Sequence, residues 1–160
     1  MDRRQVALKL VLDGLGLSVD LGSFDDRLIL QKAIYLAQEA GVDLGYYYRW
    51  YLRGPFCPAV AEDGFALLAG VGEATGWQLD SGSLKRLRRV RRLLPTTENK
   101  AQRAKKLELL ASVHFLVRRG EIAGREPKEI GKALRRFDKQ FTDQEVADAL
   151  RELSAHEFLS

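Results

Sequence analysis

Residues 23–41, SFDDRLILQKAIYLAQEAG, form the pattern of an amphipathic helix with a signal at each end. Ser23 or Asp25 can cap the first turn, where the helix dipole favours acidic groups. Gly41 supplies a C-terminal stop, because glycine readily adopts the left-handed conformation that ends many helices. Between these signals, apolar positions recur every three or four residues, which is the period of one helix face. We therefore predict a helix that runs to Ala40, in which Leu28, Ile29, Lys32, Ala33, Leu36 and Ala40 approximate this spacing.

The next stretch, residues 46–56 (YYYRWYLRGPF), changes to the two-residue period of a strand. Aromatic residues favour such pleated, half-buried surfaces. Gly54 and Pro55 are predicted to end the strand, since proline donates no ladder hydrogen bond and glycine permits a bend. A short second strand at residues 76–79 would complete a small hairpin or wing. The two predicted faces are Tyr46, Tyr48, Trp50 and Leu52 on one side, and Tyr47, Arg49, Tyr51 and Arg53 on the other.

Helical patterns occupy most of the remaining chain. We predict helices over residues 3–12, 58–69, 83–94 and 98–119, another from residue 127, and a last one after a capping box at Thr142 and Glu145. No repeat or long linker interrupts them, so the sequence predicts a mainly α fold. It is a compact, multi-helix single domain over residues 1–160 with a small β-hairpin or wing. The predicted inward positions of these helices include Val60, Phe65, Leu67, Leu68, Leu84, Leu87, Val90, Leu94, Ile130, Leu134, Phe137, Val146, Leu150 and Leu153.

The composition is typical of a folded protein. Of the 160 residues, 46% are hydrophobic and 30% charged, which argues against wholesale disorder. The single cysteine, Cys57, excludes a disulfide framework within the chain and any multi-cysteine metal site. The N-terminal residues lack the apolar core of a signal peptide, and no apolar run approaches the roughly 18–20 residues of a membrane span. We expect a soluble, cytoplasmic protein.

Positive charge is concentrated in residues 83–106, which hold ten basic residues against the single acid Glu98, a net charge of +9. The rest of the chain has 16 basic and 21 acidic residues, a net charge of −5. Such a segment attracts an anionic partner such as nucleic acid, an acidic protein or a membrane surface, or it is a solvated face that pairs with the acidic remainder. On a duplex its side chains would bind phosphates and supply little sequence selectivity. The candidate nucleic-acid contacts are Lys85, Arg86, Arg88, Arg89, Arg91 and Arg92.

Few residues have the chemistry of a catalytic or metal site. His114 lies on an apolar helical stripe, which favours a hydrogen-bonded core histidine over a metal ligand. One cysteine and two histidines make a zinc site an unfavoured hypothesis. Phosphate-binding and nucleophile-elbow glycine motifs are absent from the sequence. We predict a protein without a cofactor that is not an enzyme; a thiol-dependent enzyme that pairs Cys57 with His114 is the weaker alternative to a buried, inert thiol.

The aromatic and arginine residues of the predicted strand are a second binding candidate. Arginine and aromatic side chains are enriched at interaction hot spots. Only one face of the strand can enter the core, so Tyr47, Arg49, Tyr51 and Arg53 must be covered by another part of the fold or by a partner. The same mixture could stack the bases of a single strand. We name these four residues as the candidate partner-binding set.

Two segments carry a resemblance to known families: LQKAIYLAQ at residues 30–38, and YRWYLRGPF at residues 48–56. Together they resemble the "LQKLLYLAQ … yGP" pattern of YwgA-like bacterial and archaeal proteins, and more distantly that of Panacea-type (SocA-like) antitoxin domains. Residues 109–116, LLASVHFL, are similar to the mid-chain helix of the YwgA-like group. The resemblance implies a mostly helical, non-catalytic domain that acts through protein contacts, in some relatives by neutralising a toxin. We therefore expect an antitoxin-like or defence-associated interaction module.

The shared residues also suggest a structural joint. Gln31 and Lys32 are predicted to begin the polar side of the helix, and Tyr35 and Gln38 to lie side by side on its surface. If the turn at residues 54–55 crosses this helix, Tyr35 could hydrogen-bond that turn. A partner surface would then be the exposed rim of the joint.

Overall fold

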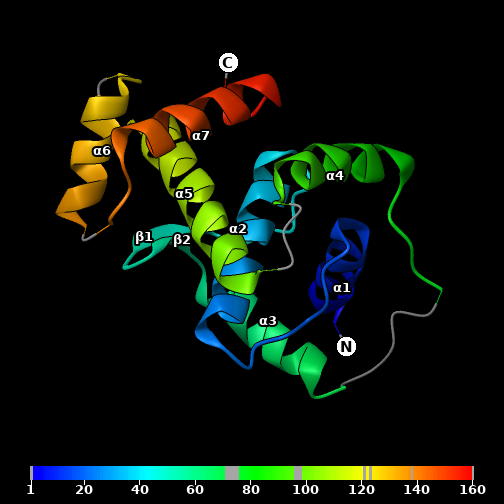
Figure 1. Cartoon of the computed structure of the whole chain (residues 1–160). Coiled ribbons are helices and arrows are strands. Elements are labelled where there is room, and N and C mark those ends of the chain that lie inside the picture. The colour runs from blue at the N-terminus through cyan, green and yellow to red at the C-terminus, as the bar shows by residue number, and fades with distance from the viewer. Residues whose placement is uncertain are drawn as a thin grey trace.

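The computed structural model describes residues 2–70, 76–95, 99–120, 122, 124–137 and 139–159. Within these residues the chain forms seven helices and one two-stranded antiparallel sheet, so the predicted mainly α fold with a small hairpin is confirmed (Figure 1). None of the helices in the described ranges is long and apolar enough to cross a membrane. The elements are α1 (Arg3–Leu15), α2 (Phe24–Glu39), β1 (Arg49–Tyr51), β2 (Gly54–Phe56), α3 (Pro58–Leu68), α4 (Ser81–Leu93), α5 (Lys100–Arg118), α6 (Pro127–Arg136) and α7 (Asp143–Ala155).

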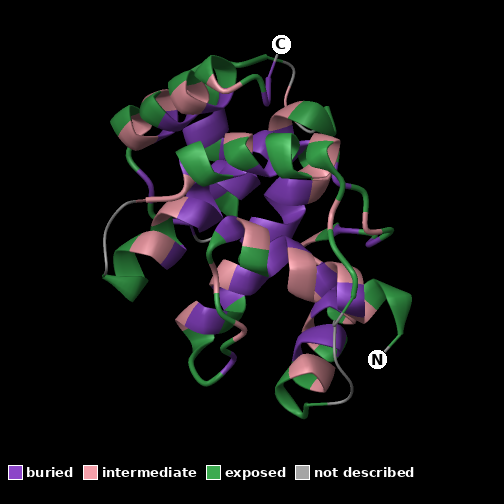
Figure 2. Ribbon diagram, turned by 90° about the vertical axis from the view of Figure 1, so that its right-hand side faces the viewer, coloured by how far each residue is buried: buried purple, intermediate pink, exposed green. Residues whose placement is uncertain are grey.

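Helices α2 and α5 pack against each other over the most extensive interface and form the centre of the fold. On one side of this pair, α1, α3 and α4 contact α2, and α1 also contacts α3 and α4. On the other side, α6 and α7 pack together and contact α5. The purple buried segments gather toward the middle of the molecule, and the outward faces of the surrounding helices are largely exposed (Figure 2). The hairpin contacts both central helices through β2.

Capping residues fix the helix ends close to where the sequence places them. Ser23 and Thr142 each form a capping box with the third residue of the helix that follows, as predicted for the second of them. Pro58 opens α3, where a missing N–H is harmless. The predicted end of the first helix at residue 12 was wrong, because α1 continues to Leu15 and stops at Gly16, whose φ is 71°.

The second strand of the hairpin is not where the sequence placed it. Residues 76–79 form no strand; β2 is Gly54–Phe56, and it pairs directly with β1. Gly54 and Pro55 therefore continue the hairpin rather than end it. Gly54 has φ 98°, and a Cβ there would clash with Ser112 Oγ, so both the turn and the contact with α5 require glycine.

Several predicted inward residues lie on the surface. Phe65, Leu68, Leu84 and Phe137 are exposed, and Leu52, at the hairpin turn, is 73% exposed. Helices α3, α4 and α6 lie at the periphery of the fold, so each buries only the part of its apolar stripe that meets its neighbours. Most other predicted core positions are buried, among them Leu36, Val60, Leu87 and Leu134.

Candidate interaction surface

The hairpin exposes the face that the sequence singled out. Tyr46 and Tyr48 enter the core, whereas Tyr47 and Tyr51 are 66% and 59% exposed. Arg49 and Arg53 are exposed on the same side, and the Arg49 guanidinium lies 5.5 Å from the centre of the Tyr47 ring. Arg53 also contacts Phe24 of α2 and Glu108 of α5, and its side chain is still 58% exposed. We call Tyr47, Arg49, Tyr51 and Arg53 the hairpin face.

Buried polar groups of α2 hold the hairpin from below. The Gln31 side chain donates to the Cys57 carbonyl at 2.9 Å and accepts from the Cys57 N–H at 3.0 Å. Lys32 Nζ donates to the Pro55 carbonyl at 2.7 Å. The prediction that Gln31 and Lys32 begin the polar side of the helix was therefore wrong: both are buried, because their partners come from the chain that crosses α2.

Gln38, seven residues after Gln31 on α2, binds the backbone of the segment that precedes the hairpin. Its side chain accepts from the N–H groups of Leu44 and Tyr46 and donates to the Tyr46 carbonyl, at 2.9–3.2 Å. The Tyr46 hydroxyl donates to the buried Asp63 at 2.7 Å, which ties this segment to α3. The predicted structural joint between the helix and the hairpin is thus present, and its residues are more buried than predicted.

Tyr35 does not reach the turn. Its hydroxyl lies 2.7 Å from His114 Nδ1, and His114 Nε2 lies 3.1 Å from the Phe158 carbonyl. Because a carbonyl only accepts, Nε2 carries the proton and Nδ1 accepts from Tyr35. Burial lowers the pKa of His114 to about 4, so the ring is neutral at pH 7. His114 is a hydrogen-bonded core histidine, and Cys57, which is also buried, is not among the partners of its ring nitrogens.

A buried charged cluster lies under the hairpin turn. Lys139 Nζ donates to the Leu52 carbonyl at 3.0 Å and lies 3.6 Å from Glu108 Oε1. Arg53 approaches the same carboxylate at 3.7 Å from the exposed side. Burial lowers the pKa of Lys139, and it lowers the pKa of Lys32 to about 7 although Glu108 opposes that shift. The turn is thus held by two buried amines, from α2 and from the chain after α6.

Two hollows border the hairpin face. The first, of about 440 Å³, lies between α2 and the turn and includes Phe24, Arg27, Tyr51 and Arg53. The second, of about 660 Å³, lies beside β1 and includes Tyr47, Arg49 and Trp50. Tyr51 and Phe56 line both, with ring centres 5.6 Å apart. The sequence patterns did not identify Phe24 or Lys139 as residues of this surface. A phenylalanine at the start of a helix is a local signal that could have identified Phe24, whereas Lys139 has no such signal.

The basic segment divides into two parts. In α5, Lys100 lies 2.7 Å from Asp26, Lys105 3.5 Å from Glu145 and Lys106 3.0 Å from Glu152, so these lysines pair with acidic residues. In α4, the exposed cations form no ion pair with any residue that the structure describes. They are Lys85, Arg86, Arg88, Arg91 and Arg92.

Arg89 differs from the other basic residues of α4. It donates to the carbonyls of His156 and Glu157, at 3.2 and 2.7 Å, and its guanidinium lies 4.8 Å from the centre of the Phe158 ring. Arg89 therefore connects α4 to the C-terminal residues by hydrogen bonds and a ring contact. These bonds occupy donors of its guanidinium within the fold, so Arg89 has fewer donors for a nucleic acid than the exposed cations of α4.

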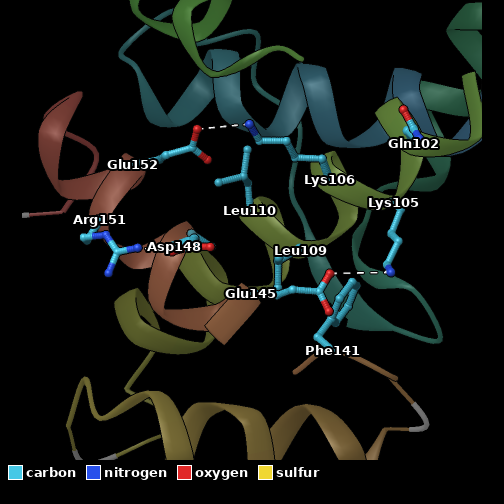
Figure 3. A pocket seen from close by; sticks show the side chains of 11 residues that line it. Gln102, Lys105, Lys106, Leu109, Leu110, Phe141, Glu145, Asp148, Arg151 and Glu152 are labelled. Carbon is cyan, nitrogen blue, oxygen red and sulfur yellow. Dashed lines mark hydrogen bonds and ion pairs between the residues drawn. The ribbon is translucent and has the colours of Figure 1, made fainter. Parts of the chain in front are cut away.

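A third hollow, of about 610 Å³, lies between α5 and α7 (Figure 3). Leu109, Leu110 and Phe141 provide its apolar part. Its charges neutralise one another: Lys105 pairs with Glu145, Lys106 with Glu152, and Arg151 with Asp148. This groove therefore offers no unmatched charge to a ligand, in contrast to the first hollow beside the hairpin.

No family model matches this chain, and no curated protein sequence matches it either. In the part of the chain that the structure describes, no group of three or more histidine, cysteine, aspartate or glutamate side chains could hold a metal ion.

Proposed function

We propose that this chain is a non-enzymatic, cytoplasmic interaction module that binds a partner protein through the hairpin face. One observation carries the proposal: two tyrosines and two arginines stand exposed together on a hairpin whose opposite face is built into the core. Exposed aromatic patches of this kind mark interaction sites in soluble proteins. Tyrosine and arginine are also the residue types that contribute most to binding at such sites.

The way the hairpin is anchored supports the same proposal. Gln31, Lys32 and Lys139 bind the backbone of residues 52–57 from the buried side. A surface that is already ordered loses little conformational entropy when a partner binds, so more of the contact energy appears as affinity. The resemblance of residues 30–38 and 48–56 to YwgA-like and Panacea-type proteins gives the proposal its specific form, an antitoxin-like or defence-associated accessory protein.

Affinity capture from native lysate tests this proposal when matched aromatic variants are compared. Tyr51→Ser removes an exposed ring from the hairpin face, and Trp77→Ser removes one of similar exposure, 55%, elsewhere on the surface. We expect wild type and Trp77→Ser to retain one partner that both Tyr51→Ser and Arg53→Ala lose. Equal retention by all four baits, or no specific partner for wild type, would refute the proposal.

Nucleic-acid binding through α4 is a second candidate function, favoured by the five exposed cations that lack ion-pair partners among the described residues. Fluorescence anisotropy with duplex and single-stranded probes, at low and moderate salt, tests it. Binding should weaken steeply with salt and fall when Arg88 and Arg92 are changed to alanine, whereas Lys128→Ala, on α6, should have little effect. No binding at low salt removes this candidate.

A further inference from the structure

The first hollow beside the hairpin combines an apolar floor with a positively charged rim. Leu28 and Phe56 contribute apolar surface, and Arg27 and Arg53 stand at its edge. Its volume of about 440 Å³ is within the range of roughly 300–1,000 Å³ that is usual for ligand sites. A side chain of a partner protein can therefore enter it.

The charges around this hollow are not balanced. Its lining includes the exposed cations Arg27 and Arg53, the buried amine of Lys32, and no carboxylate. The acids of the neighbouring first turn of α2, Asp25 and Asp26, both act on Lys100 instead, with Asp26 at 2.7 Å. Glu108, beneath the turn, is buried and shared between Lys139 and Arg53.

The Phe24 ring lies between the two arginines at the edge of the hollow. The guanidinium of Arg53 lies 5.2 Å, and that of Arg27 6.0 Å, from the centre of its half-exposed ring. Arg27 also donates one bond to the Leu21 carbonyl, which fixes its position and leaves its other donors available. Two guanidiniums that flank an exposed ring can receive one carboxylate each, or one carboxylate together.

The shape favours an extended polypeptide over a compact small molecule. Tyr51 and Phe56 line both the first hollow and the second hollow beside β1, so the two form one strip across the hairpin. The second hollow also has a cation, Arg49, and no carboxylate in its lining. A chain that crosses the strip would meet an apolar hollow, a tyrosine and a second hollow, with an arginine at each end.

We propose that the hairpin face recognises an acidic, hydrophobic segment of its partner: a large apolar side chain enters the first hollow, and flanking aspartates or glutamates contact Arg27 and Arg53. This inference rests on the proposed function, because it names the chemistry of the partner for the same surface. Affinity should decrease with salt, since the carboxylate contacts lie at an exposed rim.

Selection from a random peptide display library on the immobilised wild-type chain tests the inference. Enriched sequences should combine aromatic or leucine residues with several acids. A labelled synthetic peptide of the enriched sequence is then measured by fluorescence polarisation, beside copies in which its acids are replaced by their amides or by lysine. We expect at least about threefold weaker binding for the amide copy and none for the lysine copy.

Variants of the chain identify the surface that the peptide uses. Arg53→Gln and Arg27→Gln should each weaken binding at least about threefold, and Arg53→Lys should lose less than Arg53→Gln because it keeps the charge without the planar guanidinium. Arg88→Gln, on α4, is the matched control and should bind as wild type. Circular dichroism spectra verify that each variant is folded, and Tyr51→Ser tests the apolar contact separately.

The results separate this inference from the proposed function. Enrichment of neutral or basic peptides whose binding still needs Tyr51 would overturn the acidic preference and leave the hairpin face as a protein-binding site. A loss of binding with Arg88→Gln but not with Arg53→Gln would place the acid contacts on α4 and overturn the inference. Failure to enrich any peptide would also count against it, whereas retention of a captured partner by Tyr51→Ser would refute the proposed function.

Discussion

At the scale of single residues, the side-chain amides of Gln31 and Gln38 hydrogen-bond the backbone of the segment that crosses α2. They are seven residues apart and so lie on one face of α2. Gln31 bonds to both backbone groups of Cys57, and Gln38 binds the backbone of residues 44 and 46. The local sequence suggests only two polar helix residues, because their partners lie up to 26 positions away.

Replacing Gln31 with leucine tests this arrangement. The change keeps the approximate volume and leaves the N–H and the carbonyl of Cys57 without partners in the core. Each unsatisfied group costs roughly 1–3 kcal/mol, so the free energy of unfolding should fall by about 2–4 kcal/mol in urea titrations followed by circular dichroism. Gln144→Leu, at an exposed position of α7, should change it by less than about 0.5 kcal/mol. Equal losses for both variants would contradict the proposed role of Gln31.

Lys32 predicts an unusual pH dependence. Burial lowers its pKa from 10.5 to about 7 in the folded chain, and Glu108 opposes this shift while Lys139 adds to it. Between these two values the unfolded chain binds more protons, so the free energy of unfolding rises with pH, by about 2–3 kcal/mol between pH 6 and pH 9. Above pH 10 the buried tyrosines, whose pKa values are raised by burial, reverse the trend.

Urea titrations at several pH values measure this effect. Lys32→Met should remove most of the rise between pH 6 and pH 9 and keep the apolar stem of the side chain. Lys128→Met, at an exposed position on α6, should retain the rise. A wild-type stability that is flat or falls over this range would contradict the role given to Lys32.

At the scale of elements, local sequence predicts which hairpin side chains are buried but does not predict how its strands pair. The alternation of residues 46–51 predicts correctly which side chains enter the core and which remain outside. Strand pairing could not be predicted, because Gly54 and Pro55 carry local signals of a strand end. Their place in β2 is set by Ser112 of α5 and Lys32 of α2, which contact them from distant parts of the chain.

In helix α4, Arg89 contacts the C-terminal residues, whereas Arg92 is exposed. Separate variants can measure the contribution of each to stability. Arg89→Ala removes two hydrogen bonds to the C-terminal residues and a contact with Phe158, and should lower the free energy of unfolding by about 1–2 kcal/mol. Amide hydrogen exchange at residues 156–159 should also accelerate. Arg92→Ala, on the exposed face of the same helix, should leave both unchanged. Faster exchange in both variants would show that Arg89 has no special role.

At the scale of the whole molecule, α2 and α5 connect every other part. Sequence patterns locate these two helices and most of the residues that they bury, because capping signals and the helical period are local. They do not reveal that α2 also carries the hairpin while α5 supplies Glu108 and Ser112 beneath its turn. The candidate site therefore follows from the sequence only in its exposed side chains, and its buried support follows from the tertiary fold.

This connection predicts that the hairpin unfolds together with the helices. Trp77→Phe leaves Trp50 as the sole tryptophan, and the Trp50 ring packs against Phe115 of α5 and Phe137 beyond α6. Its fluorescence and the far-ultraviolet circular dichroism of the helices should then give coincident urea transitions, as expected for a single cooperative unit. An earlier fluorescence transition would mean that the hairpin opens before the core. The hairpin face would then be ordered only on binding, and its affinity for a partner would be reduced by the cost of that ordering.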